Sequence, residues 1–316
     1  MVRQGAYGLH TECGMVLSIM LLQGLQVTEL SVQGHILAEG DTGVYAQPTH
    51  RLYLDAPWPL PLNPYITLRK LTLDRGPHYV TTRLSYRIID AAFMLRNLVE
   101  FNLIGYLIRP PPLQARWLCS YASSSIQVIR IVDCEVPIQL LQLMILACSN
   151  LTSFSLKYST GVINPYVLIE SLYHLNQHSK SLVEVIVDLG TSVVLDDRHD
   201  PAAPPSTPNA MSFKSCQTLK HLQIPFWLLF PRVITDRIIA MKIFCDHLPP
   251  AIGNGRGTLV LAPAGGANFE DSASDYIMCR FLDAVKPKVG QIAECEVKRA
   301  PNPSSGLKRK LHWVDP

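Results

Sequence analysis

An apolar pattern at the first, fourth and sixth positions of a six-residue window recurs along this chain. It is found seven times, and successive windows begin 25 to 41 residues apart. A degenerate eighth copy, TLVL, occupies 258–261. Because self-similarity at a roughly regular period is the sequence signature of repeat architectures, we expect each copy to form one structural unit of the same kind. The seven windows are 27–32, 68–73, 98–103, 126–131, 151–156, 182–187 and 219–224.

The alternation of apolar and polar residues at the end of each window predicts a half-buried β-strand. Between the windows lie helix-like stretches at 89–97, 138–148 and 167–176. Strands joined by short helical crossovers run parallel. We therefore predict an α/β fold, an irregular leucine-rich-repeat solenoid with parallel strands on its concave face and helices on its convex face. In the second helical stretch, the residues that share one face at helical spacing are Ile138, Leu141, Met144, Ile145 and Cys148.

The predicted solenoid spans 27–265 and is interrupted by insertions at 46–65 and 196–208. Both insertions are rich in proline, which favours loops over regular helices and strands. The other expected segments are an N-terminal helical cap at 1–26, a C-terminal cap at 266–298 with a helix at 275–285 and a strand at 291–297, and a disordered tail at 299–316.

Composition narrows the classes of partner and compartment. Apolar residues make up 48% of the chain and charged residues only 17%, and the net charge of +3 is too small to indicate nucleic-acid binding. The eight cysteines contain no CxxC pair, which favours buried thiols in a reducing compartment, so we expect a cytoplasmic or nuclear protein. The apolar run at 15–22 is far shorter than the roughly twenty residues that cross a bilayer, so we expect no membrane association.

Motifs for catalysis or metal binding are absent from the sequence. There is no GxSxG nucleophile elbow and no HExxH zinc motif. His10 with Cys13, and Cys245 with His247, supply two potential ligands each, whereas a structural zinc needs four. The glycine run at 253–257 precedes an apolar strand, and we interpret it as a turn. We predict no catalytic residue, cofactor or metal and hence no enzyme; the alternative is a small-molecule or nucleotide-binding α/β enzyme that uses this glycine loop.

A protein-binding surface is the function that this pattern favours. In a solenoid, the side chains that flank the two buried positions of each strand point onto the concave face, which repeat proteins use for binding. These residues are mixed in charge, which suits a protein partner better than a polyanion. The alternative is that they are simply solvated strand residues. The candidates are Lys70, Thr72, Glu100, Asn102, Val128, Arg130, Ser153, Ser155, Glu184, Ile186, His221 and Gln223, preceded on the first strand by Glu29 and Ser31.

Three phrases resemble the leucine-rich-repeat portion of fungal F-box-like proteins: LRKLTLD at 68–74, LTSFSLKYS at 151–159 and FKSCQTLKHLQIPFWLLF at 213–230. In that family a late strand of the type LKHLxIP is followed by LPP and an apolar strand, here 248–250 and 258–261. The resemblance covers roughly 25–265. It implies a substrate-recognition subunit, in which an F-box docks on the Skp adaptor of a cullin-type ubiquitin ligase and the repeats capture the target.

The chain departs from that family before its first repeat. Only 26 residues precede the first window, and none of them forms the LPxE opening of an F-box. Two expectations therefore stand side by side. Either the repeats bind a protein partner on their own, or a cryptic segment at 15–25 retains binding to the Skp adaptor in a shortened gene product.

Overall fold

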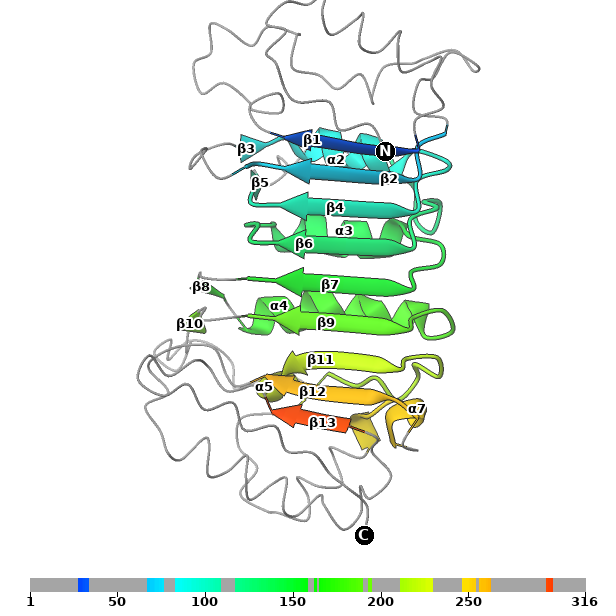
Figure 1. The fold of residues 1–316 in the computed structure, drawn as a ribbon, viewed down its shortest axis with the longest axis vertical. Helices are drawn as coiled ribbons and strands as arrows, with labels where there is room; N and C mark the ends of the chain where they lie inside the picture. Colours follow the sequence, from blue (N-terminus) through cyan, green and yellow to red (C-terminus); the bar gives the residue numbers. More distant parts are fainter. Residues whose placement is uncertain are drawn as a thin grey trace, which may run out of the picture.

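A computed structural model gives an open, parallel β-sheet with helices packed on one of its faces (Figure 1). Two pairs of short strands lie beside the main sheet: β3 (Arg83–Leu84) pairs with β5 (Leu107–Ile108), and β8 (Val162–Ile163) pairs with β10 (Val193–Val194). The structure describes residues 28–33, 67–76, 83–108, 117–158, 162–163, 165–189, 193–194, 211–229, 246–253, 256–262 and 294–297.

The main sheet has nine strands, and their spatial order is their order along the chain. All eight pairings between neighbouring strands are parallel. Seven of these strands overlap the seven predicted windows, and each ends one residue beyond its window. The prediction of one strand per window is therefore confirmed. The strands are β1 (Glu29–Gln33), β2 (Lys70–Asp74), β4 (Glu100–Ile104), β6 (Val128–Val132), β7 (Ser153–Lys157), β9 (Glu184–Asp188), β11 (His221–Pro225), β12 (Thr258–Ala262) and β13 (Glu294–Val297).

Strand register turns the apolar pattern of the sequence into continuous rows. Leu71 lies opposite Phe101, Phe101 opposite Ile129, and Ile129 opposite Phe154. The first, fourth and sixth positions of every repeat from β2 to β11 are fully buried. Because a slip of one residue would turn these side chains to the other face, the apolar rows specify the register of the whole sheet. The fourth-position row consists of Leu71, Phe101, Ile129, Phe154, Val185 and Leu222.

Helices α2 (Tyr86–Phe93), α3 (Ile138–Ala147) and α4 (Pro165–Tyr173) lie on one face of the sheet (Figure 1). Each of these three helices follows one strand and precedes the next, which is the crossover that parallel strands require. The helices are α2 (Tyr86–Phe93), α3 (Ile138–Ala147), α4 (Pro165–Tyr173) with the 3₁₀ turn η3 (His174–His178), and the short helices α5 (Phe226–Leu229) and α7 (Pro250–Gly253).

The helix prediction is wrong in the bounds of α2 and in the buried face of α3. Helix α2 begins at Tyr86 rather than at Ile89, because Ser85 caps it and accepts a hydrogen bond from the Arg87 amide at 3.4 Å, and it ends at Phe93 rather than at Asn97. In α3 the predicted face is too narrow: Leu140 and Ala147 are also buried, whereas Ile138 in the first turn is only half-buried. Helix α3 packs against α2 and α4 as well as the sheet, so more than one of its faces is covered.

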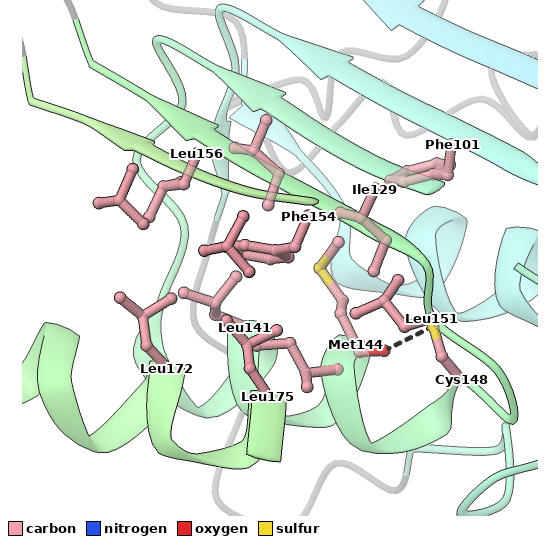
Figure 2. Packing of buried hydrophobic residues seen from close by; sticks show 14 of the residues in the cluster. Phe101, Ile129, Leu141, Met144, Cys148, Leu151, Phe154, Leu156, Leu172 and Leu175 are labelled. Carbon is pink, nitrogen blue, oxygen red and sulfur yellow. Dashed lines mark hydrogen bonds between the residues drawn. The ribbon is translucent and has the colours of Figure 1, made fainter. Parts of the chain in front are cut away.

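The core between sheet and helices is built from the same apolar rows. Figure 2 shows Leu141 and Met144 of α3 beside Phe154 of β7, with Leu151 at the entry to that strand. The thiol of Cys148 donates a hydrogen bond to the Met144 carbonyl at 3.3 Å and so closes the end of α3. Each fully buried side chain of this size stabilises the fold by about 1.5–3 kcal/mol relative to exposure, so the repeats hold one another in place through a shared core.

The entry to each repeat strand from β2 to β11 has a recurring hydrogen-bond pattern that the sequence windows do not show. Two successive amides of one repeat donate to a single carbonyl of the preceding repeat, as Gln127 and Val128 do to Val99. A hydroxyl directly before the first apolar position adds a second link: Ser181 donates to the Leu151 carbonyl and Thr218 to the Leu182 carbonyl, each at 2.8 Å. These bonds satisfy backbone groups where the strands begin and fix the spacing of the repeats.

Several predicted segments lie outside the described residues: the N-terminal cap at 1–26, both insertions, the helix at 275–285 and the tail at 299–316. The predicted last strand is present as β13, which pairs with β12. Within the described part of the chain, no helix is both long and apolar enough to span a bilayer.

Candidate functional site

The face of the sheet that points away from α2, α3 and α4 carries the predicted binding residues. We call it the helix-free face, because none of these three helices covers it, and define it by the strand residues that alternate with the buried rows. Register brings all twelve candidates into two adjacent rows. The first row is Glu29, Lys70, Glu100, Val128, Ser153, Glu184, His221 and Thr258; the second is Ser31, Thr72, Asn102, Arg130, Ser155, Ile186, Gln223 and Val260.

A third row of the helix-free face was missed by the sequence windows. Each strand extends one residue beyond the sixth position of its window, and that residue alternates back to the helix-free face. Continuing the alternation by one position would have found it. The third row contains Asp74, Ile104, Val132, Lys157 and Asp188.

A charged network joins β2, β4 and β6 in the first two rows. The Glu100 carboxylate on β4 accepts from Lys70 of β2, with 3.2 Å between Nζ and Oε1, and forms a short ion pair with Arg130 of β6. Asn102 donates from Nδ2 to both Glu100 and Thr72, each at 3.0 Å. One carboxylate thus joins three neighbouring strands and holds two cations beside it.

The ionisation of Glu100 follows from these contacts. Partial burial alone would raise its pKa, but the hydrogen bond from Asn102 and the Lys70 and Arg130 charges outweigh burial and lower the pKa below its ordinary value. Glu100 is therefore a carboxylate at neutral pH, and the network keeps its charges.

The interpretation of these residues as simply solvated is wrong for four of them. Asn102, Ser153, Ser155 and Gln223 are buried, with 4–9% of their surface exposed. Two of the four are bonded to carboxylates across strands: Ser153 donates to Glu184 at 2.7 Å and Gln223 to Asp188 at 3.1 Å. The polar side chains of the helix-free face therefore form hydrogen-bonded networks rather than a set of independent solvated side chains.

Arg130 is the exposed member of the network around Glu100. Its side chain keeps 46% of its surface exposed, and its one described contact is with Glu100. The side-chain amide oxygen (Oδ1) of the neighbouring Asn102, by contrast, is buried and has no hydrogen-bond partner among the described residues. The amide of Asn102 therefore serves to orient Glu100 and Thr72, while the guanidinium of Arg130 is presented to solvent with unused donors.

The described cysteines carry no visible nucleophile. Cys119, Cys134, Cys148 and Cys216 are free and buried. Burial raises the pKa of Cys134 to about 12 and that of Cys216 to about 11, and it raises the pKa of the other two thiols as well. These thiols are protonated at neutral pH and pack as small apolar groups. Nor do any three metal-ligating side chains gather within the described ranges, and His10, Cys13 and Cys245 lie outside them.

The glycine run at 253–257, which we interpret as a turn, begins at the last residue of α7 and ends directly before β12; residues 254 and 255 lie outside the described part of the chain. A Cβ on Gly257 would lie 2.6 Å from the Lys220 carbonyl oxygen, so glycine is required there for β12 to approach β11. A Cβ on Gly253 would meet nothing within 4 Å. The glycine at 257 thus has a packing reason that is independent of any ligand.

A small polar hollow of about 350 Å³ lies between the segments that lead into β7 and β9, lined by Ser149, Asn150 and 177–181. His178 is buried there, and its Nε2 lies 3.0 Å from the Ile145 carbonyl oxygen. Burial lowers the pKa of His178, although the bond to the carbonyl opposes that shift. A neutral histidine that bonds a helix carbonyl has a structural role, because it joins η3 to α3.

No model of a known protein family matches the chain, and no curated protein matches it either.

Proposed function

We propose that this protein is a non-catalytic, leucine-rich-repeat module that binds a protein partner through its helix-free face. The observation that carries the proposal is the nine-stranded parallel sheet in chain order, which has helices on one face and leaves the other with an ordered array of polar, charged and apolar side chains. A repeat array presents such a face as one extended surface, and repeat proteins use it to bind partners.

The architecture supports this assignment at the level of single repeats. Every repeat from β2 to β11 contributes a buried first, fourth and sixth position, a strand of five residues and the same strand-entry hydrogen bonds. The mixed charge of the helix-free face favours a protein surface over a nucleic acid, because a polyanion would meet the carboxylates of Glu29, Glu184 and Asp188.

Site-specific crosslinking tests the proposal. A photo-crosslinking residue is placed at Thr72 or His221 on the helix-free face, or at exposed Lys180 beyond η3 as a control. We expect both face positions to capture the same protein and Lys180 to capture none. Adducts at Lys180 alone, or different sets of proteins at the two face positions, would contradict the proposal.

The resemblance of 213–230 to fungal F-box-like proteins extends the proposal to substrate recognition for a cullin-type ubiquitin ligase. This extension depends on a segment at 15–25 that binds the Skp adaptor. Binding of the purified Skp adaptor to the full chain, and its loss when Ile19 and Leu22 are replaced by Asp, is the expected result. Full-length chain that fails to bind the adaptor would leave the repeats as a free-standing binding module.

A further inference from the structure

The centre of the helix-free face has more positive than negative charge. On β4, β6 and β7 the charged side chains are Glu100, Arg130 and Lys157. The single carboxylate of Glu100 is already shared between Arg130 and Lys70. Lys157 is exposed and has no ion pair within the described part of the chain. The ammonium group of Lys157, which has no ion pair among the described residues, and the guanidinium of Arg130, which bonds Glu100 through one nitrogen, thus lie on the neighbouring strands β7 and β6.

Acidic groups bound this centre on both sides. Glu29 lies at the edge strand β1, Asp74 ends β2, and Glu184 and Asp188 lie on β9. Asp74 accepts from the Gly76 amide at 2.9 Å, while Glu184 and Asp188 accept from Ser153 and Gln223. A run of acidic residues laid across the strands would be repelled by these carboxylates at both ends, so the charges favour a single carboxylate over an acidic run.

Apolar side chains flank Arg130 on its own strand and on β4. Val128 and Val132 lie two residues before and after it, and Val132 lies opposite Ile104 in the third row. Val128, Val132 and Ile104 are half-buried. A partner side chain next to the guanidinium would therefore meet apolar surface, and burial of that surface would add to the ion pair.

We propose that Arg130 anchors the carboxylate of a single Asp or Glu in a partner protein, and that an apolar residue close to it packs on Ile104 and Val132. The guanidinium offers a planar fork of donors, of which only one Nη is engaged by Glu100. Glu100 acts as a positioning residue because it pairs with the guanidinium, and Lys70 and Asn102 in turn hold the Glu100 carboxylate. This inference rests on the proposed function and specifies the chemistry of its partner.

Binding of short synthetic peptides to the full chain tests the proposal. One set of peptides carries a single Glu beside a Leu or Phe at every spacing from one to four residues; matched sets replace Glu by Gln, by Lys or by a run of Glu. We expect the single-Glu set to bind best and to weaken with added salt, since the ion pair is exposed. Peptides of the Gln or Lys sets that bind equally well would overturn the proposal.

Variants of the chain locate the contact. Arg130→Gln should weaken binding of the single-Glu peptides about tenfold or more, and Arg130→Lys should restore part of it. Arg96→Gln is the matched control, because Arg96 is an exposed arginine in the turn between α2 and β4, away from the helix-free face. Unchanged affinity of Arg130→Gln, with an unchanged melting temperature, would overturn the inference.

The same experiment separates this inference from the proposed function. Loss of peptide binding in His221→Ala or Glu184→Gln but not in Arg130→Gln would leave a binding face whose anchor is elsewhere, so only the inference fails. If no peptide of any set binds, the inference fails, and the crosslinking at Thr72 and His221 decides the proposed function independently.

Discussion

The two faces of the same strands differ in almost every respect. Toward the helices, the fourth and sixth positions are apolar and fully buried in each repeat from β2 to β12. On the helix-free face, neighbouring positions along a row change from Lys to Glu to Val to Ser. Because side chains alternate strictly along a strand, one face can hold the fold while the other varies. The proposed function would thus place the stability of the molecule and its recognition chemistry on opposite sides of one sheet.

The largest effect should come from a charge on the helix-facing side. Ile131 is fully buried on β6, directly after exposed Arg130. Ile131→Asp buries an unpaired carboxylate and removes an apolar contact, so we expect a loss of more than about 4 kcal/mol in the free energy of unfolding. Denaturation in urea measures it. Arg130→Gln is the control and should change stability by about 0.5 kcal/mol or less; an equal loss in both variants would remove the distinction between the faces.

Truncation of neighbouring residues on β7 sharpens the same comparison. Leu156→Ala should cost about 2–5 kcal/mol, because it opens a cavity in the shared core. Ser155→Ala, one residue earlier on the helix-free face, should cost about 1 kcal/mol or less. Thermal unfolding monitored by circular dichroism gives both values. A larger effect at Ser155 than at Leu156 would mean that the register of β7 is the reverse of the one described.

The links between repeats should give a smaller effect than the core. Thr218→Val removes the hydroxyl that donates to the Leu182 carbonyl at 2.8 Å while it keeps the shape of the side chain. We expect a loss of about 1 kcal/mol in unfolding free energy, the usual net value of one hydrogen bond. Ser31→Ala, at an exposed position of β1, is the control. If Thr218→Val is as stable as the wild type, strand-entry hydroxyls do not contribute to repeat spacing.

Acidification should remove the stabilising contributions of His178, on the helix side, and Glu100, on the helix-free face, at different pH. The pKa of buried His178 is lowered from 6.5, so on acidification the unfolded chain takes up that proton first and stability is lost as the pH falls below 6.5. The pKa of Glu100 is lowered from 4.5, so its contribution is present above 4.5 and is lost as the pH falls further.

Melting curves across the pH range check this order. Relative to the wild type, His178→Gln should flatten the decline that starts near 6.5, and Glu100→Gln the decline below 4.5. A decline near 6.5 that is unchanged in His178→Gln would show that the histidine is not held neutral in the fold.

The sheet could be predicted from the sequence because its signal is local and repeated. A period of two in each window and a helix between windows determine parallel strands, and Leu71, Phe101 and Ile129 fall in one row for that reason. Helix ends were less accurate: the start of α2 depends on the Ser85 cap, and the burial of α3 depends on packing against α2 and α4. Neither cause is contained in a hydrophobic period.

The sequence predicts which residues of the candidate site lie on the helix-free face, but it does not predict the contacts that these residues make with one another. Alternation along the strands placed Glu100 and Arg130 on the helix-free face, whereas their ion pair joins residues 30 positions apart and depends on the register between β4 and β6. The burial of Asn102 likewise became visible only once the strands were side by side. The third row, which contains Lys157 and Val132, could have been found by continuing the alternation one residue past each window.

The melting temperature and the peptide affinity of Arg130→Gln, measured on one preparation of the full chain, test the separation of fold and recognition most directly. The account predicts an unchanged melting temperature together with a loss of binding to peptides that carry a single Glu beside an apolar residue. A lowered melting temperature with binding retained would contradict it, because Arg130 would then support the fold rather than recognition.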